Sequence, residues 1–385
     1  MTSRRMVLTG ALGLGLAACS RQDAEEPAPP ASSSGAPASS PAPTSPQPST
    51  GDTSAPSNSS TASRTTELRI GEPQDLVTGL TTPWGLRSLD DDSLLVSERD
   101  TGAIKIVRGG RASQIGAVEG FRAQGEGGVL GIDLSPDTKV LYVYLSTGSD
   151  NRVLRYDFDG KRISSPKVIL DGIPAAGFHN GGQVTVGPDE YLYISTGDAS
   201  QREQAQDTKS LAGKILRIAP DGSVPEDNPF TNPVWSYGHR NVQGLAFDDG
   251  KRLWSVEFGD KSADEVNLIV RAGNFGWPEA EGNTGQRDGF QAPKVTWEPT
   301  ASSSPSGCAV AAGQLWVGAL MGKCLFQVPL TGEQAGDPVS HFADRYGRIR
   351  AVAAHAKGLV FSTSNTDGRT EPREGDDRLV YLPLS

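Results

Sequence analysis

The stretch Leu192-Tyr193-Ile194-Ser195, followed after a loop by Lys214-Ile215-Leu216-Arg217-Ile218, contains the pattern that best indicates the architecture. Both runs are short, mostly apolar and rich in β-branched or aromatic residues, as in the two strands of a hairpin. The same arrangement occurs six times along the chain. The runs that begin with leucine start at residues 94, 141, 192, 253, 315 and 359, and their partners are expected at 103–108, 153–159, 214–218, 265–270, 324–330 and 378–382.

The spacing of these hairpins indicates how they are assembled. Successive leucine runs begin 44 to 62 residues apart, which leaves room for four strands and one long loop in each repeat. That is the size of a β-propeller blade. A β-sandwich or a β-solenoid would also contain many short strands, but a sandwich does not require six similar hairpins and solenoid coils are shorter. We therefore predict an all-β fold, a six-bladed β-propeller, with functional residues in the loops at one end.

The N-terminus is predicted to be an export signal. Arg4-Arg5 precedes an apolar run that ends in Leu16-Ala17-Ala18-Cys19, which resembles a lipoprotein signal. Residues 1–18 are then a lipoprotein-type signal peptide, and a lipid on Cys19 anchors the exported protein to the membrane on its extracytoplasmic side. An incidental Cys19 in a secreted or uncleaved protein is the alternative, and the two arginines leave export by the twin-arginine route open.

A tether is expected between this signal and the repeats. Residues 19–66 are mostly Pro, Ala, Ser and Thr, with too little apolar surface to offset the entropy of the chain, so we predict a disordered segment. The folded body then spans 67–385. The chain has 36 Lys and Arg against 46 Asp and Glu, a net charge of −10, and lacks long basic clusters. Nucleic acid is therefore not an expected partner.

His179 is the strongest candidate for chemistry among the four histidines. It lies in Gly177-Phe178-His179-Asn180-Gly181-Gly182, and Asp198 follows the next expected strand. A hairpin turn at Gly187-Pro188-Asp189 would return Asp198 beside His179. An aspartate that accepts from one imidazole nitrogen fixes the tautomer and leaves the other nitrogen to act as a base. A structural histidine explains the spacing equally well.

Three further clusters carry charged or polar groups. Arg240, in the loop Tyr237-Gly238-His239-Arg240-Asn241, could stabilise an oxyanion or form a salt bridge between blades. The carboxylates of Glu257-Phe258-Gly259-Asp260 and Asp264-Glu265 suit Ca²⁺, although a solvated acidic loop is the competing interpretation. Arg348 and Arg350 alternate onto one strand face, which usually requires an anion such as a polycarboxylate.

Two cysteines of the body suggest a covalent link. Cys308 and Cys324 are expected on neighbouring strands of one hairpin in an exported domain. We therefore predict a disulfide between them.

Taken together, the motifs resemble the family of soluble PQQ-dependent sugar dehydrogenases, the glucose/sorbosone or aldose sugar dehydrogenases. The resemblance extends in the family's order from Pro83-Trp84-Gly85 to Gly347-Arg348-Ile349-Arg350. Between these ends lie Glu98-Arg99, Gly125-Glu126-Gly127-Gly128-Val129-Leu130-Gly131, His179-Asn180-Gly181-Gly182, Gly187-Pro188-Asp189, Ala205-Gln206-Asp207, Leu211-Ala212-Gly213-Lys214-Ile215-Leu216-Arg217, Gly238-His239-Arg240-Asn241, Asp264-Glu265-Val266-Asn267 and Asn274-Phe275-Gly276-Trp277-Pro278.

The resemblance implies a reaction and roles for its residues. His179, oriented by Asp198, would remove the proton from the anomeric hydroxyl of an aldose, and a hydride would pass from C1 to the C5 carbonyl of PQQ. The sugar would leave as a lactone, and the electrons would pass to an external acceptor. Glu126 stands near the substrate position, while Arg240 and Asn241 would contact the quinone.

The resemblance also implies how the cofactors are held. Arg348 and Arg350 would bind the PQQ carboxylates. The backbone carbonyls of Gly259 and Asp260 would hold a Ca²⁺ that polarises the PQQ carbonyl, and Glu265 would bind a second, structural Ca²⁺.

Two positions depart from the family's pattern. Met321 stands where better-known members place a lysine against PQQ, with Lys323 on the same strand face, and Asp260 replaces the usual proline or glutamine. Met321 supports an alternative function, a binding module that kept the fold and lost the redox chemistry. A Ca²⁺-dependent lactone hydrolase is the other alternative, but it has no use for paired arginines.

Overall fold

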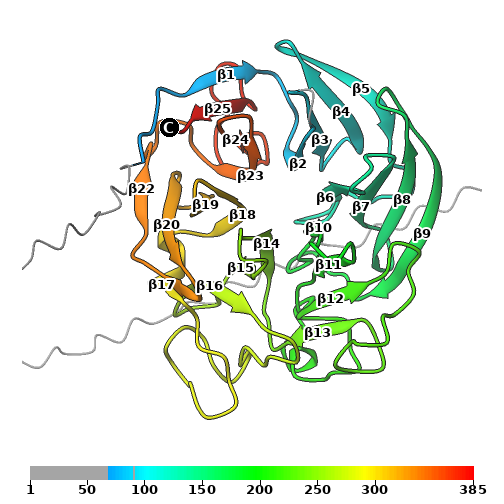
Figure 1. The fold of residues 1–385 in the computed structure, drawn as a ribbon, viewed down its shortest axis with the longest axis vertical. Coiled ribbons are helices and arrows are strands. Elements are labelled where there is room, and N and C mark those ends of the chain that lie inside the picture. The colour runs from blue at the N-terminus through cyan, green and yellow to red at the C-terminus, as the bar shows by residue number, and fades with distance from the viewer. Residues whose placement is uncertain (1–67, 90–91) are drawn as a thin grey trace, which may run out of the picture. The chain divides into compact units, whose positions relative to one another are not determined.

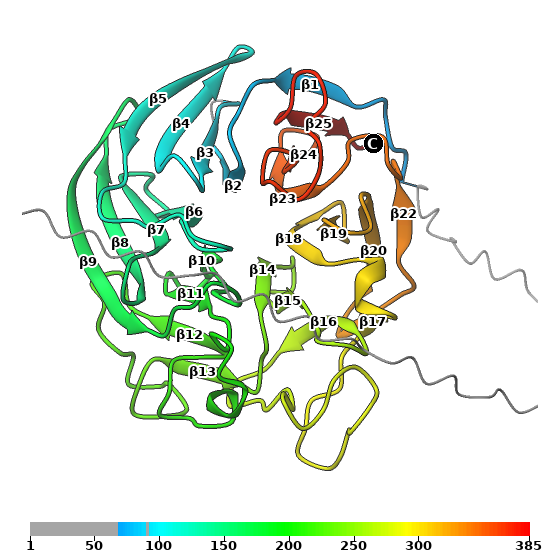
Figure 2. The same cartoon turned by 180° about the vertical axis from the view of Figure 1, so that it is seen from behind.

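Six antiparallel sheets form the part of the chain that the computed structural model describes, residues 68–89 and 92–385. They are arranged as blades around a central axis (Figures 1 and 2), so the predicted all-β, six-bladed propeller is confirmed. The predicted signal peptide, Cys19 and the tether up to residue 66 lie outside the described residues. Within the described residues, no helix has the length and apolar character needed to cross a membrane.

Each blade contains one of the six predicted hairpins. The strands, grouped by blade, are β2 (Pro83–Ser88), β3 (Leu94–Glu98), β4 (Ala103–Arg108) and β5 (Arg111–Ala117); β6 (Val129–Leu134), β7 (Val140–Ser146), β8 (Asn151–Phe158) and β9 (Ile163–Ile173); β10 (Val184–Val186), β11 (Leu192–Ser195), β12 (Lys214–Ile218) and β13 (Val234–Tyr237); β14 (Val242–Phe247), β15 (Leu253–Glu257), β16 (Asp264–Ile269) and β17 (Val295–Trp297); β18 (Pro305–Ala311), β19 (Gln314–Ala319), β20 (Leu325–Thr331), β21 (Gln334–Ala335) and β22 (Val339–His341); β23 (Ile349–His355), β24 (Gly358–Thr363), β25 (Leu379–Pro383) and β1 (Gln74–Val77).

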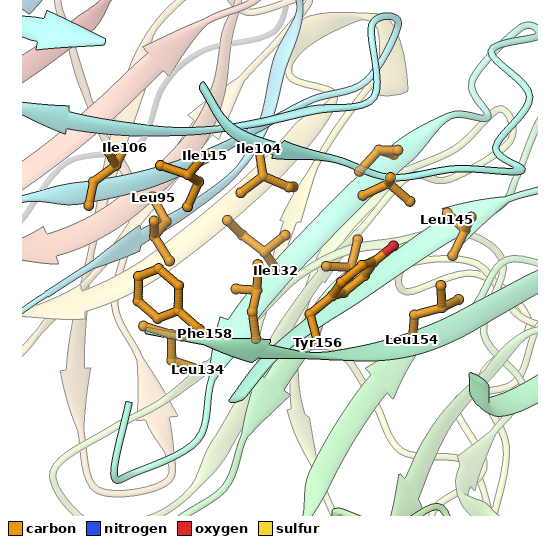
Figure 3. Close-up of a cluster of buried hydrophobic side chains, with 14 residues drawn as sticks. Leu95, Ile104, Ile106, Ile115, Ile132, Leu134, Leu145, Leu154, Tyr156 and Phe158 are labelled. Carbon is orange, nitrogen blue, oxygen red and sulfur yellow. The ribbon is translucent and has the colours of Figure 1, made fainter. Parts of the chain in front are cut away.

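The leucine runs are the second strands of the blades. β3, β11, β15 and β24 are buried at every residue, because neighbouring blades cover both faces of each sheet. That double burial explains why these strands are continuously apolar rather than alternating. Figure 3 shows the core between the first two blades, where Leu95 and Ile104 lie close to Ile132, Leu154 and Phe158.

The ring is closed by the two ends of the described chain. β1 pairs antiparallel with β25, with Gln74 opposite Tyr381, so the first strand completes the last blade. This closure covers the edge that β25 would otherwise expose. The six hairpins predicted from the sequence do not include β1.

The innermost strands, β2, β6, β10, β14, β18 and β23, surround the axis (Figure 1). In five of them the register shifts near the first residues, as at a β-bulge. Four of these strands carry a glycine at the shift, namely Gly85, Gly131, Gly244 and Gly307. A Cβ at any of the four would lie only 2.4 to 2.8 Å from a backbone oxygen on the next inner strand or directly beside it. Bulges of this kind re-aim neighbouring side chains, and the loops at this end carry the candidate functional residues. We call it the site end.

Candidate active site

His179 and Asp198 meet at the site end, as the hairpin predicted. His179 precedes β10, Asp198 follows β11, and His179 Nδ1 lies 2.7 Å from Asp198 Oδ1. The Asp198 side chain is completely buried, whereas that of His179 is 20% exposed. The imidazole lines a cavity of about 280 Å³. Exposure to a cavity distinguishes His179 from a purely structural histidine.

His239 shows the contrast. It is fully buried, with Ser236 Oγ 2.9 Å from one ring nitrogen and Glu257 Oε2 2.8 Å from the other. Its ring stacks on Phe275. Both nitrogens are therefore occupied, and His239 is structural.

The backbone around His179 is held in an uncommon conformation. His179 has a φ of 61°, and Ala199 and Ser200 also have positive φ. The His179 amide donates to Glu126 Oε2 at 3.0 Å, and its carbonyl accepts from the Ala199 amide at 3.1 Å. Gly197 is required beside it, because a Cβ there would lie 2.0 Å from the His179 carbonyl oxygen. Such strained positions concentrate at functional sites.

Asp198 stays ionised in this environment. Burial acts to raise the pKa of Asp198, but the hydrogen bond and charge of His179, the indole of Trp277 and the Ser200 amide together lower that pKa below its usual value. An ionised carboxylate can only accept. The proton shared with Asp198 therefore belongs to His179 Nδ1, which leaves Nε2 as the basic nitrogen.

The cavity brings together residues from four blades and the loops between them. Four of the predicted site residues line it, namely Glu126, His179, Arg240 and Gly259. Met321 also lines it, together with Phe258 and Asp264 of the predicted acidic cluster and with Thr300, Ala301 and Ser304. Thr300–Ser302 forms a short 3-10 helix, and no sequence motif marked this segment.

Arg240 extends along one wall of the cavity. Its guanidinium donates to the Phe258 carbonyl at 3.2 Å and to Asp260 Oδ1 at 3.3 Å. The buried Nε has no hydrogen-bond partner in the described part of the chain. One donor of a permanent cation is thus left for a ligand.

Asn241 begins a buried polar network that leads to Arg350. Asn241 Oδ1 accepts from the Gly181 amide and from Gln243 Nε2, both at 3.0 Å, while Asn241 Nδ2 has no partner among the described residues. Arg350 Nη1 donates to Gln243 Oε1 at 2.7 Å, and Arg350 Nε is likewise left without a partner in residues 68–89 and 92–385. Unpaired buried donors are rare in folded proteins.

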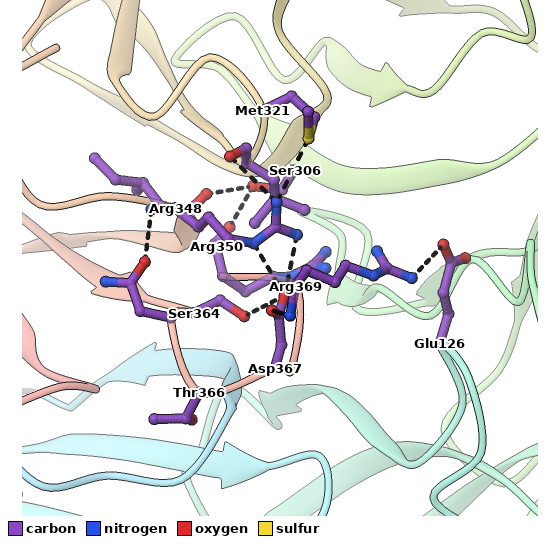
Figure 4. Close-up of polar contacts among 12 residues, drawn as sticks. Glu126, Ser306, Met321, Arg348, Arg350, Ser364, Thr366, Asp367 and Arg369 are labelled. Atoms are coloured by element: carbon purple, nitrogen blue, oxygen red, sulfur yellow. Dashed lines mark hydrogen bonds and ion pairs between the residues drawn. The ribbon is translucent and has the colours of Figure 1, made fainter. Parts of the chain in front are cut away.

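The two predicted arginines of the last blade lie close together but differ in their pairing (Figure 4). Arg348 forms a buried ion pair with Asp367, N to Oδ2 at 3.0 Å. Arg350 has no carboxylate partner among the described residues, and burial, together with the positive charges of Arg99 and Arg348, lowers its pKa to about 9. A buried guanidinium without a paired carboxylate suits an anionic ligand.

Glu126 has a partner that the sequence analysis missed. Arg369, in the loop after β24, donates to Glu126 Oε1 at 3.3 Å (Figure 4). The two residues are 243 positions apart, and no local pattern links them. The ion pair joins the second and sixth blades at the mouth of the cavity.

The predicted metal ligands receive uneven support. Gly259 lines the cavity, and no hydrogen bond recorded for the described residues ends on the carbonyl oxygens of Gly259 or Asp260. Glu265 is buried opposite Glu257 in the ladder, and burial, reinforced by that neighbouring charge, raises its pKa to about 8. No group of three or more His, Cys, Asp or Glu side chains among the described residues is arranged to hold a metal ion.

The predicted disulfide is wrong. Cys308 and Cys324 are both buried, free thiols. Cys308 is on β18 and Cys324 directly precedes β20, so β19 runs between them. Two strand spacings, about 9.6 Å, exceed the Cα separation that a disulfide tolerates.

Fold and site together define a class of protein, a six-bladed β-propeller whose candidate functional residues lie at one end of the axis. The family described as Glucose / Sorbosone dehydrogenase matches residues 80–371. The chain belongs to this family, as the motifs predicted.

The chain is also similar to individual proteins and solved structures. An uncharacterised protein of Synechocystis is 38% identical over 53% of this chain and 58% of its own length, so the match spans little more than half of that relative. The aldose sugar dehydrogenase of Escherichia coli (strain K12) is 27% identical over 72% of this chain and 86% of its own length. The solved structure of the PQQ-bound aldose sugar dehydrogenase from Streptomyces coelicolor is 44% identical, covers 83% of this chain and 99% of that chain, and has a TM-score of 0.80.

Proposed function

We propose that the chain oxidises an aldose at C1 to the lactone with PQQ as hydride acceptor, and that electrons then pass to an external acceptor. The observation that carries this proposal is the pairing of His179 with buried Asp198 at a cavity whose wall also carries Arg240, a cation whose buried Nε has no hydrogen-bond partner among the described residues. The family membership and the PQQ-bound relative support the same chemistry.

The residues around the cavity fit PQQ, a quinone that carries carboxylates. Four buried side-chain N–H groups have no partner in the described chain; Trp297 Nε1 is one, and the other three are Arg240 Nε, Asn241 Nδ2 and Arg350 Nε. The last three belong to residues that the resemblance assigned to the cofactor. Donors of this kind match carbonyl and carboxylate oxygens, and the buried Arg350 guanidinium, which has no paired carboxylate among the described residues, favours an anion.

Met321 does not prevent this fit. Its side chain is 52% exposed, lines the cavity and places its sulfur 3.7 Å from Arg348 Nη1. A thioether cannot supply the charge of the family's lysine, so Arg348 and Arg350 carry the binding of the carboxylates.

The protein's own part in the reaction follows from the tautomer of His179. Its Nε2 removes the proton of the C1 hydroxyl, while the imidazolium that forms is stabilised by ionised Asp198. Glu126 and the Arg369 that pairs with it border the substrate side, and Arg240 and Asn241 present donors to developing negative charge. The chemistry that PQQ supplies when bound is acceptance of the hydride from C1.

Ca²⁺ is part of the same proposal. The carbonyl oxygens of Gly259 and Asp260 would hold the ion, since hard cations prefer oxygen ligands, and it would act as a Lewis acid beside the cofactor. A role for Glu265 with a second Ca²⁺ stays a prediction. Its oxygens accept from the Gly282 amide at 2.6 Å and from Asn267 Nδ2 at 2.9 Å.

Cofactor binding and turnover test the proposal together. The purified protein is incubated with Ca²⁺ and PQQ, and glucose and a dye acceptor are added. We expect dye reduction that requires PQQ, and calorimetry should detect PQQ binding without sugar. Absence of PQQ binding would favour the binding module, and lactone cleavage with Ca²⁺ alone would favour the hydrolase.

A matched pair of histidine variants tests the base. His179→Ala is expected to lower kcat by about 10²- to 10⁴-fold, the usual contribution of a general base, with PQQ affinity largely retained. His341→Ala is the control, because His341 is on the outer strand β22 and bonds Gln327. An active His179→Ala protein would remove His179 from the mechanism.

The cellular location belongs to the proposal as well. The signal-like segment and Cys19 support export and lipid anchoring. Metabolic labelling with a radioactive fatty acid should mark the full chain and not the Cys19→Ser variant, and equal labelling of both would refute the anchor.

A further inference from the structure

We propose that Trp277 is a positioning residue that fixes the Asp198–His179 pair. Hydrogen bonds between loops of the third and fourth blades hold its indole in place. This inference rests on the proposed function, in which His179 is the base. It assigns a role to two motifs that the proposed function leaves unused, Ala205-Gln206-Asp207 and Asn274-Phe275-Gly276-Trp277-Pro278.

The indole holds the second oxygen of the carboxylate. Trp277 Nε1 donates to Asp198 Oδ2 at 2.9 Å, and Trp277 is 4% exposed. Asp198 Oδ1 accepts from His179 Nδ1 at 2.7 Å and from the Ser200 amide at 2.8 Å. With both oxygens restrained, the carboxylate plane cannot rotate, and the direction of the bond to His179 is set.

A clasp between two loops holds Trp277 in place. Gln206 Nε2 donates to Asn274 Oδ1 at 3.0 Å and to the Trp277 carbonyl at 2.7 Å, and Asn274 Nδ2 donates back to Gln206 Oε1 at 2.8 Å. The Trp277 amide donates to the Gly238 carbonyl at 2.9 Å. Gln206 follows β11 in the third blade, whereas Asn274 and Trp277 follow β16 in the fourth. The clasp therefore crosses the boundary between blades.

Buried Lys214 supports the Gln206 side of this clasp. Its Nζ donates to the carbonyls of Gln204 at 2.7 Å and Ala205 at 3.0 Å, and also to that of Ala212. Lys214 has no exposed surface. It thus fixes the two residues directly before Gln206.

Two guanidinium groups lie over the indole ring. Arg202 Cζ is 4.4 Å and Arg240 Cζ 5.4 Å from the ring centroid. Both arginines also pair with Asp260, at 3.8 and 3.3 Å. A cation over the ring draws electron density from the indole and strengthens its N–H as a donor.

The other charged groups near the pair come from several elements. Glu126 accepts from the His179 amide and pairs with Arg369, while Arg240 and Asp264 line the same cavity. None of them provides the second donor to the Asp198 carboxylate that Trp277 provides.

The test compares two tryptophan-to-phenylalanine variants. Trp277→Phe keeps an aromatic ring and removes the donor. Trp254→Phe is the matched control, because Trp254 Nε1 donates to Asp248 Oδ2 at the same 2.9 Å, but Asp248 follows the far end of β14. Both variants remove the indole donor of a fourth-blade tryptophan from a buried Trp–Asp hydrogen bond, and only Trp277→Phe removes it at Asp198.

The readout is the His179 imidazole itself, measured without cofactor. The ¹⁵N resonances of the imidazoles are followed against pH, with His179 assigned by its loss in His179→Ala. In Trp277→Phe the carboxylate can rotate away from the imidazole, so the ¹⁵N resonances of His179 should indicate a mixture of the two neutral tautomers, where the wild type shows the Nδ1-protonated form. Trp254→Phe should match the wild type.

The kinetics of the loaded enzyme should follow. In Trp277→Phe we expect kcat to fall about tenfold, a fraction of the contribution of a general base, with little change in KM. An unchanged tautomer of His179 in Trp277→Phe would overturn the inference. If Trp277→Phe does not fold, Gln206→Leu is the second variant, because it removes the hydrogen bond to the Trp277 carbonyl and leaves the indole intact. Gln206→Leu should change the His179 tautomer in the same direction but to a smaller extent. An unchanged tautomer in that variant would equally overturn the inference.

This inference and the proposed function can fail separately. If Trp277→Phe shifts the His179 resonances while His179→Ala remains active, Trp277 positions the pair but His179 is not the base. If His179→Ala is inactive and Trp277→Phe behaves as the wild type, the base stands and the positioning role does not.

Discussion

The His179 region and the Arg350 region lie at the same end of the axis, yet they differ in whether their buried polar atoms have hydrogen-bond partners. Around Asp198 both carboxylate oxygens have donors. Around Arg350 a buried N–H has no partner in the described chain, and burial, together with neighbouring cations, lowers the pKa of the guanidinium. Under the proposed function, the difference separates a proton-transfer pair that is complete before any ligand arrives from a binding site that a ligand must complete.

The largest effect is expected from a substitution in the His179–Asp198 pair. Asp198→Asn can donate to His179 as well as accept, so it permits the tautomer with the proton on Nε2 and blocks the base. We expect kcat to fall about a thousandfold, with PQQ affinity within a factor of about three because the carboxylate does not face the arginines. Stopped-flow dye reduction and calorimetry measure the two quantities, and a large loss of PQQ affinity would contradict the separation of the two regions.

The next largest effects are expected from substitutions of Arg348 and Arg350, and they should differ between the two arginines. Arg348→Met leaves the 1% exposed carboxylate of Asp367 without its partner, so the free energy of unfolding should fall by about 3 kcal/mol. Arg350→Met removes a cation that its neighbours repel, so the cofactor-free protein should lose less than about 1 kcal/mol, while PQQ affinity falls about 30-fold, or about 2 kcal/mol. Urea unfolding and calorimetry test this, and equal losses of stability would erase the distinction.

A pH effect on stability should arise from Lys214, which supports the loop that holds Trp277 beside Asp198. Burial lowers its pKa to about 7, against an ordinary value of about 10.4. Between these values the unfolded chain binds more protons at this residue than the folded chain, so its contribution to the free energy of unfolding rises with pH from about 7 to about 10. Urea unfolding of Lys214→Met should show a smaller rise than the wild type over this range. An identical slope would mean that Lys214 keeps its charge.

The smallest effect should come from the ion pair that bridges the two regions. Arg369 and Glu126 are 39% and 20% exposed in their side chains, and such pairs contribute about 0.2 to 1 kcal/mol. Arg369→Ala should change KM for the sugar by no more than about fivefold, and the change should shrink in high salt. A loss of kcat comparable to that of His179→Ala would place Arg369 in the chemistry.

Local patterns predicted the propeller and much of the site because each depended on short-range order. The leucine runs revealed β3 and β11, since doubly covered strands are continuously apolar, and the turn at Gly187 placed Asp198 beside His179. The pairing of β1 with β25 and of Arg369 with Glu126 joins residues far apart in sequence, for which one chain carries no local signal. The predicted disulfide is wrong because Cys308 and Cys324 were expected on neighbouring strands of one hairpin, whereas β19 lies between their strands.

The closure of the last blade by β1 has a consequence for biogenesis. Gln74 cannot find Tyr381 until nearly the whole chain has been synthesised, and a loop of that length adds an entropic cost to forming the final contact. A ribosome-bound or truncated chain that ends before β25 therefore exposes two unpaired edges, on β1 and on β24, and each is a template for association with other chains. Association of an incomplete chain with other chains should accordingly begin at these two edges.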